Sequence, residues 1–118
     1  MTAIPLETCR LAKEAGFPQD RWPQMVWASI GLGRFEIHYY THPRATDIHP
    51  EWYAAPSPLD LLEWLEAEKG WDWWRQSPRE RAVTACWFAN HSDGKQLLAS
   101  ADTAADLCLA VLQRLVKP

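Results

Sequence analysis

The chain repeats one order of side-chain types in two stretches, Pro56-Ser57-Pro58-Leu59-Asp60-Leu61-Leu62 and Asp102-Thr103-Ala104-Ala105-Asp106-Leu107-Cys108. In each stretch a hydroxyl residue is followed by two spacers, an acid and an apolar run. A serine or threonine hydroxyl accepts a hydrogen bond from the free N–H groups of a starting helix, and an acid three residues later suits the positive helix end. A short apolar segment precedes each stretch. The sequence therefore predicts two places where a strand leads into a capped helix.

The other elements follow from apolar periodicity and from chain breakers. Gly16 is expected to stop the first helix, and Gly31-Leu32-Gly33 and Ser92-Asp93-Gly94 are expected to turn two hairpins. The expected helices are residues 5–15, 58–69 and 104–116; the expected hairpin strands are 25–30 with 34–40 and 83–90 with 95–100; the expected loop and irregular segments are 41–51 and 71–80.

The order α-ββ-α-ββ-α predicts a single α+β domain over residues 1–118, with helices packed on an antiparallel sheet. A length of 118 residues suits one domain. Whether residues 52–55 form a further short strand is left undecided by the sequence. The alternation of residues 34–40 is typical of a half-buried strand, with Phe35, Ile37 and Tyr39 on one face. Near-regular helical spacing predicts that the last helix buries one stripe, formed by Leu107, Val111, Leu112 and Leu115.

Composition narrows the class of partner. The net charge of −3 argues against nucleic acid as a partner, and acids lie among the one group of arginines, Arg75, Arg79 and Arg81. No apolar run is long enough for a bilayer and no secretory leader is visible, so we expect a cytoplasmic protein with no membrane partner. Three cysteines without paired spacing fit reduced thiols.

Histidine and cysteine patterns give no catalytic or metal-binding motif. His38 and His42 would lie about 13 Å apart along an extended strand, and His49 would reach them only after a sharp bend. Cys86 and His91 would lie about 16 Å apart, on opposite faces of a strand, which is too far for a cysteine nucleophile and its base. We therefore predict no catalytic residue, no metal ligand and no cofactor.

Three tryptophans within four residues form the first candidate surface: Trp71, Trp73 and Trp74. One interpretation is packing, in which one or two of these indoles close the core beneath the second helix. The other is a contact surface for a protein partner, because tryptophan is enriched at binding hot spots. Both interpretations stay open from the sequence.

The second candidate is the polar face of the strand at residues 34–40. Its members alternate with the apolar ones and are Arg34, Glu36, His38 and Tyr40. They are expected either to form a solvated sheet face or to bind a small ligand there.

Three segments resemble a family of small phage and prophage proteins: residues 7–19 (ETCRLAKEAGFPQ), 55–62 (APSPLDLL) and 99–106 (ASADTAAD). The three segments resemble, in order, three motifs of that family: an LKEAGFPQ-like opening, a P-[ST]-L-x-E-L helix start and a final T-P-E-E-A-x-A-x-L-x-L helix. Residues 105 and 106, alanine and aspartate, stand where the family has two acids. The resemblance implies a bacterial or phage source and an α+β fold, and it implies no catalytic residue. The strand followed by a capped helix at the end of the sequence is also similar to small antitoxins, although no DNA-binding segment is legible beside it.

These observations favour a non-enzymatic phage-type protein that acts through protein–protein contact or self-association. We expect a homodimer with Trp73 or Trp74 at or near its interface, because one domain of this length would leave apolar surface uncovered. The alternative is a small-ligand-binding protein or an enzyme that uses the sheet face around His38 and Tyr40.

Overall fold

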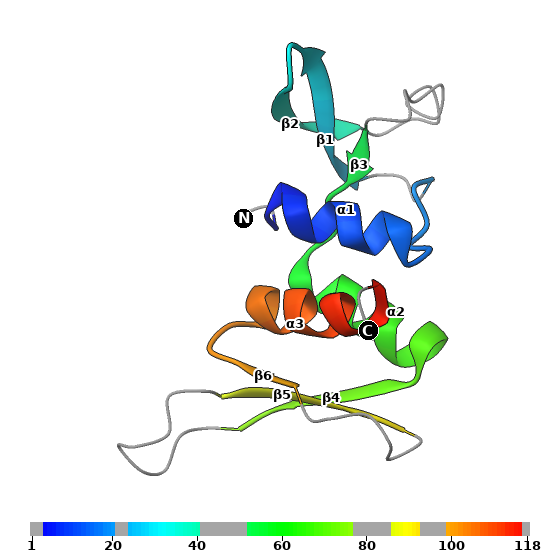
Figure 1. Cartoon of the computed structure of the whole chain (residues 1–118), viewed down its shortest axis with the longest axis vertical. Helices are drawn as coiled ribbons and strands as arrows, with labels where there is room; N and C mark the ends of the chain where they lie inside the picture. The colour runs from blue at the N-terminus through cyan, green and yellow to red at the C-terminus, as the bar shows by residue number, and fades with distance from the viewer. Residues whose placement is uncertain (1–3, 21–23, 41–51, 77–85, 93–98, 117–118) are drawn as a thin grey trace. The chain divides into compact units, whose positions relative to one another are not determined.

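The computed structural model describes residues 4–20, 24–40, 52–76, 86–92 and 99–116 (Figure 1). The chain divides into two compact units, Met1–Ser57 and Pro58–Pro118. Each unit holds one three-stranded antiparallel sheet together with its own helix or helices. The fold is therefore α+β, as the sequence predicts, with two sheets where the prediction has one. The prediction of a single domain stays a prediction.

The first helix, α1 (Leu6–Glu14), has Ala15 as its C-cap, directly before the predicted glycine. The N–H of Phe17 donates to the Ala12 carbonyl at 2.9 Å, and that of Gly16 donates to the Lys13 carbonyl at 3.0 Å. These two bonds form a Schellman motif, which needs a residue with positive φ directly after the helix. Gly16 supplies it with a φ of 100°. The predicted stop at Gly16 is confirmed.

The sheet of the first unit has the strand order β2-β1-β3. Its strands are β1 (Gln24–Gly31), β2 (Arg34–Tyr40) and β3 (Tyr53–Ala54). The first two form the predicted hairpin. Strand β3 lies within residues 52–55, where the sequence left a further short strand undecided. Strand β1 lies in the middle, where it pairs with β2 and β3. Within the described part of the chain, β2 and β3 are therefore the edges of this sheet.

Strand β2 is more exposed than its alternating pattern predicts. Ile37 and Tyr39 are 36% and 60% exposed, and their partners on β1, Trp27 and Met25, are half-buried. The fully buried residues of β1, Val26 and Ala28, point to the other face of the sheet, because they pair with His38 and Glu36. The better covered face of this sheet is therefore not the one that carries the apolar residues of β2.

The second unit holds helices α2 (Pro58–Lys69) and α3 (Ala104–Val116) at the predicted positions. Both helices lie on one face of a sheet with the order β4-β5-β6 (Figure 1). The aliphatic core side chains of α2 and α3 are 1% exposed or less and are Leu61, Leu62, Leu65, Leu107, Val111 and Leu112. Leu115, which was expected among them, is half-buried because it belongs to the last turn of α3.

The sheet of the second unit corrects the prediction for residues 71–80. Strand β4 (Trp71–Arg75) replaces the start of the expected irregular segment and pairs with β5 (Trp87–His91). Strand β6 (Ala99–Ala101) completes this sheet, so the element order is α-βββ-α-βββ-α. The expected strand residues 83–85 and 95–98, the turn residues 93 and 94, and the loop 41–51 lie outside the described residues.

The hydroxyl cap predicted before the last helix is confirmed. The N–H of Asp106 donates to Thr103 Oγ1 at 3.1 Å, and the N–H of Leu107 donates to the Thr103 carbonyl at 3.0 Å. Thr103 is therefore the N-cap residue of α3, and the acid at position 106 lies in its first turn.

We expect Thr103→Ala to lower the free energy of unfolding by about 1 kcal/mol, because one helix N–H loses its acceptor. Thr103→Ser keeps a hydroxyl at this position and should leave stability nearly unchanged. Urea denaturation followed by circular dichroism measures both. Equal losses for the two variants would show that the hydroxyl contributes little.

Candidate interaction surface

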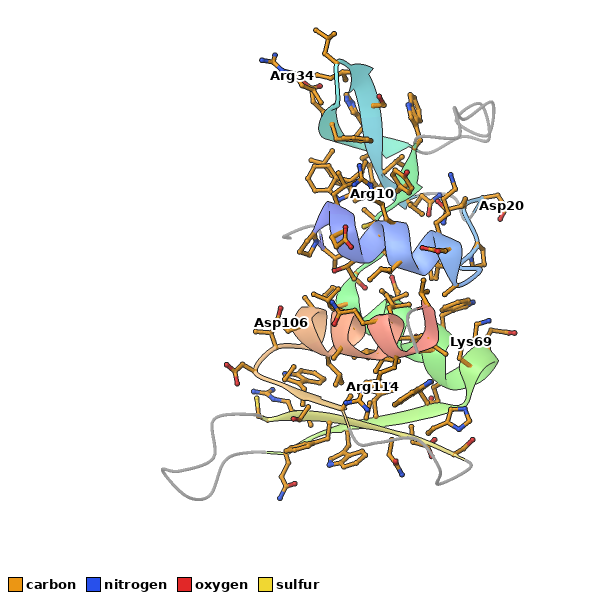
Figure 2. The ribbon with its side chains drawn as sticks, viewed as in Figure 1. Arg10, Asp20, Arg34, Lys69, Asp106 and Arg114 are labelled. Atoms are coloured by element: carbon orange, nitrogen blue, oxygen red, sulfur yellow. The ribbon has the colours of Figure 1, made fainter. Side chains whose placement is uncertain are left out.

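The alternation of β4 separates the three clustered tryptophans. Directly paired residues of an antiparallel sheet point to the same face, and successive residues point to opposite faces. Trp71 and Trp73 therefore share the face that carries α2 and α3, and Trp74 lies on the other face. Side chains project from both faces of this sheet (Figure 2). The structure thus does not bring all three predicted residues onto one surface.

Trp71 belongs to the core of the second unit. It is 1% exposed, and its ring meets His91 edge-on with 5.6 Å between the ring centroids. Gly70 joins it to α2 at a φ of 71°, and a β-carbon there would lie 2.9 Å from Ser92 Oγ. The tight link from helix to strand therefore positions this indole against the helices. For Trp71 the packing interpretation holds.

Trp74 is exposed and forms a flat pair with Phe88. It is 40% exposed, and its ring stacks on Phe88 with 5.6 Å between centroids and an interplanar angle of 17°. The two residues lie directly opposite each other on β4 and β5. Cross-strand aromatic pairs of this kind hold each other in place. The pair presents a preformed aromatic surface on the sheet face away from the helices.

Polar residues surround this aromatic pair on the same face. The register places Asp72 opposite Asn90, next to the aromatic pair, and places Ser100 opposite Phe88 on the other side. Asp72 and Ser100 are exposed and Asn90 is half-buried. An apolar centre with a polar rim is the usual composition of a protein-binding patch. We call Trp74, Phe88, Asp72, Asn90 and Ser100 the outer aromatic face.

Trp73 and Trp87 form a second stack on the helix side of the sheet. Their centroids are 6.0 Å apart, and the Arg75 guanidinium lies 5.7 Å from the Trp87 ring. Both indoles are half-buried. The buried Trp73 Nε1 has no acceptor among the described residues. Trp73 is therefore intermediate between the core position of Trp71 and the open position of Trp74.

The polar face of β2 brings only two of its predicted members together. His38 Nε2 lies 3.3 Å from Glu36 Oε2, and both side chains are about half exposed. Arg34 is exposed at the hairpin end of the strand (Figure 2). Tyr40 occupies the far end of the strand, and the position of its side chain lies outside the described part. The geometry described for this face is thus one histidine–carboxylate pair.

A cation–aromatic cluster in the first unit was missed by the sequence interpretation. The Arg10 guanidinium of α1 lies 5.4 Å from the Phe35 ring and 5.6 Å from the Tyr53 ring, which are themselves 6.1 Å apart (Figure 2). Lys13 Nζ lies 4.9 Å from the Tyr53 ring and donates to the Trp52 carbonyl at 3.1 Å. Burial lowers the pKa of Lys13. The contacts attach α1 to β2 and β3, and no local sequence pattern announces them.

The cysteines occupy the places expected of structural thiols. Cys9 and Cys108 are fully buried, and burial raises the pKa of each thiol to about 12. Cys86 is half-buried and donates to the Asp102 carbonyl at 3.3 Å. It lies before the start of β5 and His91 at its end, so the two are not neighbours.

The described segments contain no metal-binding cluster and no membrane-spanning helix. No group of three or more histidine, cysteine or acidic side chains there would hold a metal ion. His42 and His49, which were considered with His38 as metal ligands in the sequence, lie outside those segments. None of the helices described has the length and apolarity that crossing a bilayer requires.

Comparison with known proteins adds no relative to this geometry. The chain matches no protein-family model, no curated protein and no solved structure. The candidate surface is therefore interpreted from its own residues.

Proposed function

We propose that this protein is a non-enzymatic, cytoplasmic protein of the phage or prophage type that acts through protein–protein contact. The outer aromatic face is its contact surface. One observation carries the proposal: Trp74 is 40% exposed while stacked on Phe88, on the sheet face opposite α2 and α3. Stacked and open, this indole offers a large apolar area with little conformational entropy left to lose on binding.

The chemistry of the rim favours a protein over a small ligand. A small-ligand site is a concavity with a few converging polar groups, whereas Asp72, Asn90 and Ser100 are spread along three strands of one sheet face. A tryptophan surrounded by separated polar groups resembles the anchor residue of a protein interface. Trp74 is thus the expected hot spot, and Trp71 is excluded from the surface by its burial.

Site-specific crosslinking in cells tests this proposal. A photoreactive benzophenone amino acid is placed at position 74 and, as a control, at position 66, where Glu66 is exposed on α2. We expect a discrete protein adduct at position 74 upon irradiation and no such adduct at position 66. An adduct of twice the chain mass would identify the partner as a second copy. The same adducts at both positions, or none at 74, would contradict the proposal.

A further inference from the structure

Strand β2 is the most open edge among the strands described. It spans seven residues, whereas the other edge strands, β3, β4 and β6, span two, five and three. It pairs with β1 on one side, and no described strand lies along its other side. Ile37 and Tyr39 are exposed on it. A long edge strand with exposed apolar side chains is a template for pairing with another chain.

We propose that β2 pairs with β2 of a second copy of the chain, antiparallel and around a two-fold axis at Ile37. The three-stranded sheet of the first unit in one copy would then join the same sheet of the other copy, which gives one six-stranded sheet. The observation that identifies the partner is that the sequence of β2, Arg34-Phe35-Glu36-Ile37-His38-Tyr39-Tyr40, is complementary to itself about its centre. This surface is separate from the outer aromatic face, so the inference goes beyond the proposed function.

The register centred on Ile37 places suitable side chains opposite each other. Glu36 lies opposite His38 of the second copy, Phe35 lies opposite Tyr39 of the second copy, and the two Ile37 residues meet on the axis. Within one chain, the His38 imidazole and the Glu36 carboxylate already lie 3.3 Å apart, so the two groups suit each other as hydrogen-bond partners. Opposite charges and aromatic pairs directly across an antiparallel ladder are stabilising. Pairing would also bring the exposed side chains of Ile37 and Tyr39 next to apolar neighbours.

The two neighbouring registers are less favourable. Residues that lie directly opposite each other must point to the same face of the sheet, so the two-fold axis passes at one residue of β2 and not between two residues. The two neighbouring registers are therefore centred on Glu36 and on His38. A centre at Glu36 places two carboxylates opposite each other, which is destabilising. A centre at His38 places two imidazoles opposite each other and places Glu36 opposite Tyr40 of the second copy, so no basic residue lies across from the carboxylate. Charge complementarity therefore selects Ile37 as the centre.

Three single-cysteine variants test this register directly. Cys86→Ser is the common background, since Cys9 and Cys108 are fully buried, and cysteine is then placed at position 36, 37 or 38. Residues directly opposite have Cα atoms about 4.5–5.5 Å apart, within disulfide range, and diagonal ones are about 7–8 Å apart. Under mild oxidation, we expect Ile37→Cys to give a covalent dimer and Glu36→Cys and His38→Cys to stay largely monomeric. Preferential crosslinking at position 36 or 38, or no crosslinking at 37, would overturn the proposal.

Sedimentation at micromolar concentration supplies the measurement without a crosslink. The protein with its natural sequence should sediment as a dimer and Ile37→Lys as a monomer, because two ammonium groups would meet on the axis. Leu32→Lys is the matched control, since Leu32 is fully exposed at the hairpin turn, outside β2. A monomeric natural sequence, or a dimer that Ile37→Lys leaves intact, would refute β2 pairing. Both variants retain Trp74, so the crosslinking result at position 74 is independent of this one.

Discussion

Replacement of Trp71 by alanine should lower the free energy of unfolding by about 3–5 kcal/mol, the range for a large aromatic residue removed from a core. Trp71 is 1% exposed, and its ring packs against His91 on the helix side of the sheet. Its removal leaves a cavity that the surrounding helices and strands fill only in part. Chemical denaturation, followed by far-ultraviolet circular dichroism, measures the loss.

Trp74→Ala is the matched control, with the same residue type on the same strand. Its indole is 40% exposed and contacts Phe88 on the open face. The loss should be about 1–2 kcal/mol, most of it from the stacked pair and its partial burial. Similar losses at positions 71 and 74 would mean that β4 does not alternate as described.

The second unit shows which elements can be predicted from the sequence and which cannot. Helices α2 and α3 have the predicted bounds because their signals are local: Thr103 caps α3, and Gly70 supplies the positive φ at the end of α2. Strand β4 was missed because Trp73 and Trp74 are adjacent, and a pair of equal residues hides the alternation of a strand. Only pairing with β5 reveals which indole lies on which face.

Exposure on β2 was misjudged for a related reason. Local alternation predicts which residues of a strand share a face, but it does not say which face of the sheet is covered: the buried Val26 and Ala28 of β1 lie on the face opposite to Ile37. The order β2-β1-β3 depends on the pairing of Trp27 with Tyr53, which are far apart in sequence. The cluster of Arg10, Phe35 and Tyr53 likewise joins three separate elements. Phe88, the partner of Trp74, would be found from sequence only after both strands and their register were known.

Alkaline solution should destabilise the protein, because both buried thiols resist ionisation in the folded state. Burial raises the pKa of Cys9 and of Cys108 from 9.0 to about 12. Below about pH 9 the thiols are protonated in the folded and the unfolded chain, and their contribution to stability is fully present. Between about pH 9 and pH 12 the unfolded chain releases thiol protons that the folded chain retains. The free energy of unfolding therefore falls as the pH rises through this window.

The expected loss is a substantial fraction of the stability of an ordinary domain. Each thiol lowers the free energy of unfolding by about 1.4 kcal/mol per pH unit in the window, which is on the order of 4 kcal/mol for each thiol across the window. Natural domains are stable by about 5–15 kcal/mol. Lys13 acts in the opposite direction, since its pKa is lowered in the folded state, but its ammonium group is mostly solvated and the effect is smaller.

Alanine variants separate the thiols from other groups that ionise in base. Cys9→Ala and Cys108→Ala each lower stability near neutral pH through lost packing, so the readout is the slope of unfolding free energy against pH, measured by urea denaturation from about pH 8 to about pH 11. Each variant should have a shallower slope than the natural sequence. Cys86→Ala, which removes the half-buried thiol directly before β5, is the control and should keep the steeper slope. Identical slopes in all four proteins would mean that neither buried thiol is coupled to unfolding, because a thiol that opens to solvent in the folded state ionises at the same pH before and after unfolding.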